Sequence, residues 1–261
     1  MSRVMAPQVT RSSGGRVARI VIGPGVRRNA LTSAGWAGIE RAVGRLATDD
    51  SLRVVVIEGA SGWFCAGSDI REWDAASMDD VELSFQRMEA ACRAVEELPV
   101  PVIGKVRGAA AGAGCQLALA CDLRVMSDNA SIGMPIAVLG ILVSVSFANR
   151  LTAVAGAAAA RELLYTGRMV GAEEAVRLGL ANACVRGEDL DRRVDQVIDS
   201  ILGASGAAVR AAKSAVSAIQ APARVAAGAV AGGSPVAYDD FSKGVDAFLH
   251  RRRARAHRVA R

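Results

Sequence analysis

The chain has 261 residues, of which 51% are hydrophobic and 22% charged, and this composition excludes intrinsic disorder and predicts a large buried core. The formal net charge of +6 is concentrated at the two ends, but aromatic residues make up only 4% and no nucleic-acid motif is present, so we expect no nucleic-acid partner. No apolar run is long enough to span a bilayer, and the N-terminus lacks a signal-peptide core. We therefore expect no membrane partner and a cytoplasmic location.

The side-chain inventory limits the chemistry further. Both histidines, His250 and His257, lie in the basic C-terminal tail, so we expect neither a histidine-based catalytic triad nor a metal site. The five cysteines have no metal-ligand spacing, and most have apolar neighbours, which predicts reduced, structural thiols. They stand at positions 65, 92, 115, 121 and 184.

The first half of the chain alternates short β-type runs with segments of helical periodicity. Apolar side chains recur on one face of residues 33–47, where Ser33 is the expected N-cap, and a second helix is expected over residues 79–97. Because alternating strands and helices need crossover connections, we expect a largely parallel sheet. The β-type runs cover residues 17–22, 52–57 and 101–106.

Residues 106–125, VRGAAAGAGCQLALACDLRV, hold a glycine-rich turn followed by an apolar helix of about three turns that is expected to end at Asp122. Since this helix is apolar on every side, we expect it to be buried, with the free N–H groups of its first turn directed at the glycine turn. Gln116 is the one polar side chain of that first turn. A buried helix packed through small residues, with Gln116 bonded to backbone, explains the same pattern, and the GxGxxG spacing of a dinucleotide loop is absent.

A second glycine turn follows the 52–57 run and reads FCAGSDI over residues 64–70. Two such turns, each placed after a buried strand, can direct two backbone N–H groups at one oxygen, which is the geometry of an oxyanion hole. The pair of turns therefore marks a candidate site that neither turn would mark alone.

The second half of the chain is mostly helical. Short strands are expected at residues 123–126 and 131–134, and a hinge at 232–235 within a Gly/Ala/Pro-rich segment. Helices are expected at residues 146–154, 158–166, 172–178, 189–202 and 207–219. A last amphipathic helix has an apolar stripe that we expect to form part of an oligomer contact. The stripe consists of Tyr238, Phe241, Val245, Phe248 and Leu249.

Several ordered motifs resemble the enoyl-CoA hydratase/isomerase, or crotonase, superfamily over about residues 17 to 253. They are RRNAL at 27–31, FCAGSDI at 64–70, the stretch at 108–122, YTGRMVGAEEAVRLGL at 165–180 and DDFSKGVDAF at 239–248.

The resemblance implies an α/β fold with a crotonase-like ββα spiral core. Residues 1–200 would form the core with an acyl-CoA site, and residues 201–261 a C-terminal helical oligomerisation region. The resemblance also implies a homotrimer or a dimer of trimers, an acyl-CoA substrate, and no cofactor besides the coenzyme A of that substrate.

Carried over by position, the two oxyanion donors of the family fall on the backbone N–H groups of Ser68 and Ala113, and a further catalytic position falls on Gln116. Arg28 would meet the phosphates of coenzyme A. The full set of expected substrate-binding residues is Arg28, Ala30, Leu31, Ala66, Asp69, Ile70, Gly112, Ile136 and Phe248.

The chain departs from the family where proton transfer is concerned. Family hydratases use two glutamates, and those positions hold Gln116 and Ile136, which cannot transfer a proton near neutral pH. General acid–base catalysis contributes roughly 10²–10⁴ in rate per group, so simple hydration should be poor. We therefore expect an enzyme of the lyase or isomerase class that carries out isomerisation, decarboxylation or another enolate-type reaction. The alternatives are a non-catalytic acyl-CoA-binding protein and a hydratase with an atypical acid.

Other carboxylates stand close to the first turn. Asp69, Glu72 and Asp74 are the nearest candidate acids in the sequence, although each is also explained as a solvated or structural carboxylate. A position that holds an aspartate in some family members falls on Ser144, which we expect to be a loop residue.

Overall fold

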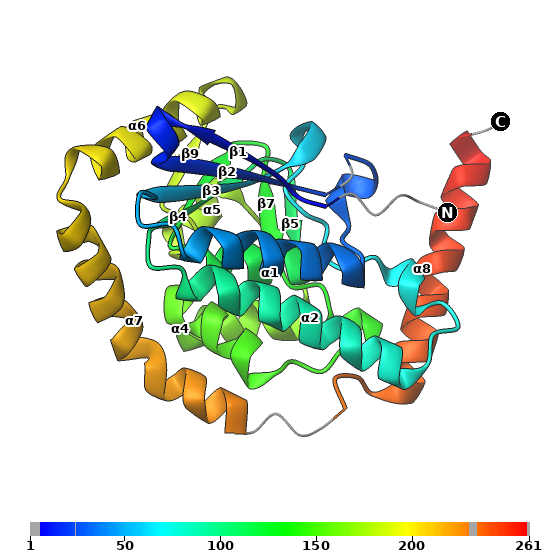
Figure 1. Ribbon diagram of the computed structural model, residues 1–261. Helices are drawn as coiled ribbons and strands as arrows, with labels where there is room; N and C mark the ends of the chain where they lie inside the picture. Colours follow the sequence, from blue (N-terminus) through cyan, green and yellow to red (C-terminus); the bar gives the residue numbers. More distant parts are fainter. Residues whose placement is uncertain (1–5, 24, 230–233, 260–261) are drawn as a thin grey trace.

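The computed structural model describes residues 6–23, 25–229 and 234–259. A six-stranded sheet with the order β1-β2-β3-β4-β6-β9 forms its centre (Figure 1). Neighbouring strands are parallel except β1, which pairs antiparallel with β2. The largely parallel sheet is therefore confirmed. Its strands are β1 Gln8–Ser12, β2 Val17–Ile22, β3 Val54–Gly59, β4 Val102–Val106, β6 Leu123–Ser127 and β9 Ala183–Val185.

A second sheet of three short strands has the order β5-β7-β8, with β5 parallel and β8 antiparallel to the central β7. Its strands are β5 Ala109–Ala111, β7 Ser131–Gly133 and β8 Met169–Gly171. The sequence predicts β7 but not β1, β5, β8 or β9, because strands of three to five residues with small or polar side chains carry little periodicity.

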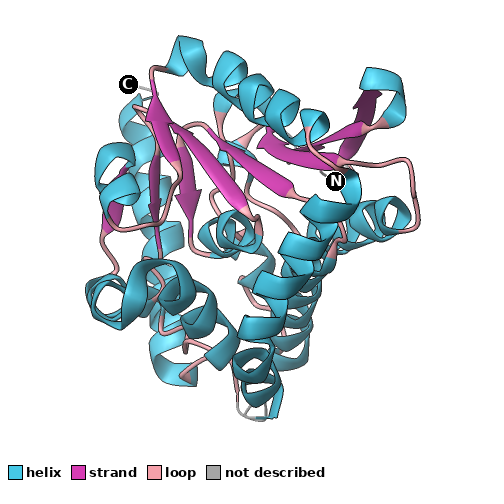
Figure 2. Ribbon diagram, turned by 90° about the vertical axis from the view of Figure 1, so that its left-hand side faces the viewer, coloured by secondary structure: helices cyan, strands magenta, loops and turns pink. Residues whose placement is uncertain are grey.

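Helices cover both faces of the large sheet, as Figures 1 and 2 show. Alternate residues of β3 point to opposite sides: Val54 and Val56 pack with α6, whereas Val55 and Ile57 pack with α1, α2 and α3. Burial on both faces explains why this strand is a continuous apolar run. The α-helices are α1 Ser33–Ala47, α2 Met78–Glu97, α3 Ala113–Ala120, α4 Val145–Thr166, α5 Ala172–Arg177, α6 Leu190–Gly203, α7 Gly206–Ala229 and α8 Tyr238–Val259.

Six short 3₁₀ turns complete the described chain: η1 Ser13–Gly15, η2 Arg27–Asn29, η3 Ala60–Gly62, η4 Ile70–Trp73, η5 Ala137–Leu139 and η6 Gly187–Asp189.

Helix α1 begins one residue earlier than predicted. Thr32, not Ser33, is the N-cap, and its hydroxyl accepts a hydrogen bond from the Gly35 N–H at 3.1 Å. Ser144 is the last residue of the loop before α4, as expected, and it also caps this helix, because its hydroxyl accepts from the Phe147 N–H at 3.2 Å. The two helices predicted at 146–154 and 158–166 are the two halves of α4, separated by the non-helical Gly156 (φ 74°, ψ 164°).

Helix α3 is shorter than the predicted three turns. It ends at Ala120, because Asp122 accepts a hydrogen bond from the Val102 N–H of β4 at 2.7 Å and the chain has already turned into β6. The buried guanidinium of Arg124 donates to the carbonyls of Ala118 and Cys121 at the end of α3. Burial lowers the pKa of Arg124, and these carbonyls solvate the charge in place of water.

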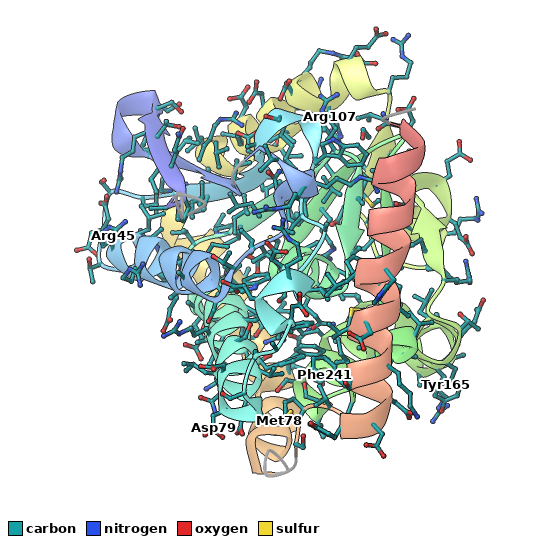
Figure 3. All side chains as sticks on the ribbon, turned by 90° about the vertical axis from the view of Figure 1, so that its right-hand side faces the viewer. Arg45, Met78, Asp79, Arg107, Tyr165 and Phe241 are labelled. Atoms are coloured by element: carbon teal, nitrogen blue, oxygen red, sulfur yellow. The ribbon has the colours of Figure 1, made fainter. Side chains whose placement is uncertain are left out.

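The apolar stripe of α8 packs against the chain itself. Phe241, Val245 and Leu249 are buried, and the Phe241 ring lies 5.5 Å from that of Trp73. Figure 3 shows α8 along one side of the molecule with Phe241 directed toward the rest of the chain. Including Tyr238 in the stripe was wrong, because this side chain is 65% exposed. The stripe is used within the chain and so does not indicate an oligomer contact.

Two further expectations stay predictions. The hinge at 232–235 lies partly outside the described residues, and the division into residues 1–200 and 201–261 is not tested by the packing of α7 and α8. Within the described residues, no helix has the length and apolar composition needed to cross a membrane.

The Phe241 contact can be tested by truncation. Phe241→Ala should lower the free energy of unfolding by roughly 3–5 kcal/mol, because it leaves a cavity between α8 and Trp73. Tyr238→Ala on the same helix is the control and should change it by about 0.5 kcal/mol or less, as is usual for exposed positions. Urea denaturation of the two variants measures the difference, and equal losses would show that α8 is not held by its buried stripe.

Candidate active site

The two glycine turns predicted from the sequence lie against each other. Cys65 pairs with β5 through hydrogen bonds from its N–H to the Ala109 carbonyl and from the Ala111 N–H to its own carbonyl, both 3.0 Å long. On its other side, the first turn pairs with Leu31, whose N–H donates to Gly67 and whose carbonyl accepts from Asp69. Backbone hydrogen bonds therefore fix the position of the first turn from two directions.

The contact between the turns leaves no room for side chains. A Cβ on Gly114 would lie 2.1 Å from the carbonyl oxygen of Cys65, and one on Gly67 would lie 2.7 Å from that of Ala111 and 3.2 Å from the nitrogen of Ala113. Gly67 also has a φ of 94°, which disfavours other residues. These glycines are therefore required for the two turns to touch, as the sequence suggested.

The backbone N–H groups of Ser68 and Ala113 lie at this contact and have no acceptor within the described residues, and the same holds for the N–H of Gly114. Ala113 is the first residue of α3, where helix geometry leaves the N–H group free. The Ser68 hydroxyl accepts from the indole N–H of Trp36 at 3.1 Å, so this side chain supports α1 while its N–H stays free.

Ile136 forms an apolar wall beside the second turn. It is buried, and its Cγ2 lies 3.7 Å from the position of a Cβ on Gly112. The structure thus brings Ile136 next to Gly112, as the resemblance implies. A water molecule has no polar side-chain partner on this wall.

The Gln116 side chain is fully buried and hydrogen-bonded. Its amide nitrogen donates to the Phe147 carbonyl and to the Met134 sulfur, both at 3.5 Å. Its amide oxygen accepts from the Arg150 guanidinium at 3.4 Å. The alternative in which Gln116 bonds to backbone thus describes only one of its partners. The other partner is the buried side chain of Arg150.

Asp69 is held in a structural ion pair. Arg71 Nε donates to it at 2.9 Å, and an Arg27 nitrogen lies 3.5 Å away. Burial raises the pKa of Asp69, but the hydrogen bonds and charge of Arg71 and the charge of Arg27 lower it by more, so the net pKa lies below its ordinary value. The carboxylate is therefore charged at neutral pH and a poor proton donor.

The other two candidate acids lie at the surface. The Glu72 carboxylate accepts from the Ser33 N–H at 2.6 Å and so adds a cap to α1, while partial burial raises its pKa. Asp74 is exposed at the end of η4. Asp69 and Glu72 thus have structural roles that the sequence did not distinguish from catalytic ones.

Asn29 belongs to the segment that the resemblance places along the coenzyme A channel, and the structure shows that it organises the neighbouring turns. Its amide nitrogen donates to the carbonyls of Ala60 at 2.8 Å and Trp63 at 2.6 Å, and its oxygen accepts from the Gly25 N–H at 2.9 Å. Its φ of 57° belongs to a run of three left-handed residues, 27–29. Asn tolerates this conformation better than most residues, and this preference is the only feature of the sequence that could have indicated its role in the turn.

The expected coenzyme A residues differ in their exposure and in the elements that carry them. The Arg28 guanidinium stacks 4.6 Å over the ring of Trp63 and is exposed, which leaves its N–H donors accessible. Leu31 is buried, and Phe248 packs against the core from α8. Ala30, Ala66 and Ile70 are half-buried in or beside the two turns.

The cysteines are free thiols, and four of the five are buried. Burial raises the pKa of Cys65, which lies in the first turn, to about 12, so it is a neutral thiol and no nucleophile at physiological pH. Among the described residues, no group of His, Cys, Asp and Glu is arranged to hold a metal ion.

The family model for enoyl-CoA hydratase/isomerase matches residues 14–257. The chain belongs to the enoyl-CoA hydratase/isomerase family. It is 33% identical to the crotonyl-CoA hydratase of Syntrophomonas wolfei over 230 residues, which are 87% of this chain and 88% of that protein. Its 32% identity to "Probable enoyl-CoA hydratase 2, mitochondrial" of Arabidopsis thaliana covers 73% of this chain but only 64% of that protein.

Solved structures agree with this assignment. An enoyl-CoA hydratase/isomerase family protein from Hyphomonas neptunium superposes with a TM-score of 0.79 at 29% identity, over 100% of this chain and 97% of that chain. An enoyl-CoA hydratase/carnithine racemase from Magnetospirillum magneticum gives the same TM-score at 29% identity, over 84% and 82% of the two chains. The expected crotonase-like α/β fold with a helical C-terminal region is thus confirmed.

The contact between the two turns can be tested at Gly114. Gly114→Ala should lower the free energy of unfolding by roughly 1–3 kcal/mol or more, because the new methyl group meets backbone that cannot yield without moving a turn. Gly44→Ala is the matched control: Gly44 is an exposed position within α1 with no atom near its Cβ position, and Ala should stabilise it by about 0.5–1 kcal/mol. Urea denaturation should show that the two substitutions change the free energy of unfolding in opposite directions. A Gly114→Ala variant as stable as the parent would contradict the contact.

Proposed function

We propose that this protein binds an acyl-CoA thioester with its carbonyl oxygen between the N–H groups of Ser68 and Ala113. The observation that supports this is the pair of N–H groups without a protein acceptor at the contact of the two turns. The positive end of the α3 dipole adds to the stabilisation of negative charge there. Each donor of this kind contributes roughly 10²–10³ in rate when the carbonyl becomes enolate-like.

The proposed reaction is of the enolate type: an isomerisation, a decarboxylation or a related step, which places the protein among lyases or isomerases. Gln116 and Ile136 cannot move a proton, so among these reactions a decarboxylation, which needs no protein base, fits the site best, and an isomerisation would need a base supplied by another residue. In a decarboxylation the bond between the α-carbon and the carboxylate breaks, and its electron pair forms the enolate as CO₂ leaves. Solvent can then supply the proton to the α-carbon.

Two alternatives have support of their own. Relatives named as hydratases favour hydration, which then requires an acid other than the missing pair. The structural role of Asp69 favours a protein that binds acyl-CoA without turning it over, because Arg71 and Arg27 hold this carboxylate in its charged form. Turnover assays separate these alternatives from the enolate-type reaction.

We further infer the setting in which the site works. The reaction uses no cofactor besides the coenzyme A of the substrate, whose phosphates Arg28 would meet. The chain forms a homotrimer or a dimer of trimers, for which the exposed apolar side chains of Val138, Leu142 and Ile219 offer contact surface. It has no nucleic-acid or membrane partner, and its location is cytoplasmic, although some relatives carry "mitochondrial" in their names.

Removal of one donor tests the binding mode. Ala113→Pro deletes a backbone N–H at the first residue of a helix, where proline is well tolerated. In the parent, the carbonyl stretch of ¹³C-labelled acetyl-CoA should move to lower frequency on binding. In the variant this shift should shrink, and affinity for acetyl-CoA should fall by about tenfold or less, the worth of one hydrogen bond. Affinity for free coenzyme A, which has no thioester, should stay the same. An unchanged carbonyl shift would place the thioester elsewhere.

Hydration gives a second test, of the chemistry rather than of binding. Crotonyl-CoA hydration by the parent should be slower than that of the Syntrophomonas wolfei enzyme, measured beside it, by at least the roughly 10²–10⁴ that one missing acid–base group costs. Loss of enoyl-thioester absorbance measures both rates. Comparable rates would mean that a carboxylate not recognised here transfers the proton.

A further inference from the structure

A buried arginine lies directly behind the first turn of α3. The Arg150 side chain, 5% exposed, lies on α4 and faces two glutamates on α2. Glu89 accepts two hydrogen bonds from it at 2.6 and 2.9 Å, and Glu96 accepts two at 3.0 and 3.2 Å. The glutamates are seven residues apart, which is two helical turns, so both lie on one face of α2.

The remaining donor of Arg150 binds Gln116. A guanidinium has five N–H groups, and four of them are taken by the two bidentate carboxylates. The fifth donates to the Gln116 amide oxygen at 3.4 Å. The amide nitrogen of Gln116 then faces the carbonyl oxygen of Phe147 at 3.5 Å. This network fixes the orientation of the amide: the oxygen must meet a donor and the nitrogen an acceptor.

The cluster around Gln116 is already negative. Arg150 contributes one positive charge, and Glu89 and Glu96 contribute two negative charges. The fourth titratable side chain at this cluster, Cys92 of α2, is a neutral thiol, because burial raises its pKa. A carboxylate at position 116 would add a further negative charge at a fully buried site and would direct an oxygen at the Phe147 carbonyl.

We propose that Arg150 is a positioning residue that fixes the first turn of α3 through Gln116, and that the cluster of Arg150, Glu89 and Glu96 accepts only an uncharged side chain at position 116. Gln116 is then a neutral structural link and not a glutamate that has lost its acid. Through α3 the same link holds the N–H of Ala113, and only this last step rests on the proposed function.

Gln116→Glu tests the charge requirement without any ligand. The cluster should raise the pKa of the introduced carboxyl above the ordinary glutamate value of about 4.3, because its charged form is buried beside two carboxylates. An acid whose pKa is higher in the folded than in the unfolded state destabilises the fold as the pH rises from the unfolded pKa to the folded pKa, because only the unfolded chain loses its proton in this range. The folding equilibrium constant of the variant, relative to the parent, should therefore fall about tenfold per pH unit from about pH 5 until the carboxyl has ionised.

Gln196→Glu is the matched control, because Gln196 is exposed on α6. Its stability relative to the parent should not depend on pH above about pH 6, where an ordinary carboxyl is ionised in both states. Urea denaturation between pH 5 and pH 8 measures both variants. If the stability of Gln116→Glu relative to the parent did not change with pH, the proposal would be overturned. Failure of this variant to fold at pH 5 would also overturn it, because the protonated side chain there has the shape of glutamine.

A double-mutant cycle assigns the effect to the cluster. Glu89→Gln removes one negative charge while keeping a hydrogen-bond acceptor for Arg150. In this background Gln116→Glu returns the cluster to the charge of the parent. The decrease in the folding equilibrium constant that Gln116→Glu causes at pH 8 should therefore be at least tenfold smaller than in the wild-type background. An equal loss in both backgrounds would show that the charge of the cluster is not the cause.

The link to the site is tested separately. Arg150→Lys keeps the charge but loses the planar fork that binds three partners at once. If Arg150 positions α3, the ¹³C carbonyl shift of bound acetyl-CoA should shrink in this variant while the affinity for free coenzyme A is kept. An unchanged shift would overturn the positioning role. Absence of acetyl-CoA binding by the parent would overturn the proposed function instead and leave the pH experiment decisive for the cluster.

Discussion

The site depends on a contact between two backbones that excludes side chains. The Cα of Gly114 faces the carbonyl of Cys65 so closely that a methyl group would lie 2.1 Å from the oxygen. This approach brings the start of α3 to the turn that follows β3, and β5 fills the remaining edge through its hydrogen bonds to Cys65. Backbone contacts, and not side chains, therefore fix the positions of Ser68 and Ala113 at the meeting point of the turns.

Two buried arginines pair with polar groups near the two ends of α3. Arg124 binds the carbonyls at the C-terminal end, and Arg150 binds the Gln116 amide near the N-terminal end. A buried helix with unpaired carbonyls would cost several kcal/mol, roughly 1–3 for each group. With these groups paired, the first-turn N–H groups of α3, that of Ala113 among them, remain without an acceptor in the described residues, and unpaired donors at a buried helix end call for a ligand or water as their explanation.

The sequence predicts what local patterns determine. The runs that became β2, β3, β4, β6 and β7 and the long helices follow from periodicity, and the two turns follow from glycine after a buried strand. Partners far apart in the chain leave no such trace. Nothing in the spacing of Arg150 from Glu89, 61 residues earlier, indicates their ion pair, and the sequence favoured a solvated or structural role for Asp69 without naming the arginines that it binds. The apolar stripe of α8 was visible, but whether it faces its own core or another chain depends on packing that periodicity does not contain.

The division between backbone and side-chain groups also explains what family membership means for this chain. The proposed oxyanion donors are main-chain N–H groups, which persist through almost any substitution that keeps the turns. Acids and bases are side chains, and a single codon change can remove them. A member of the family can therefore keep a thioester-binding geometry while its reaction changes, and resemblance to hydratases is a better guide to the ligand than to the chemistry. In this chain the neutral Gln116, held by a cluster that is already negative, indicates that the change at this position is built into the surrounding core.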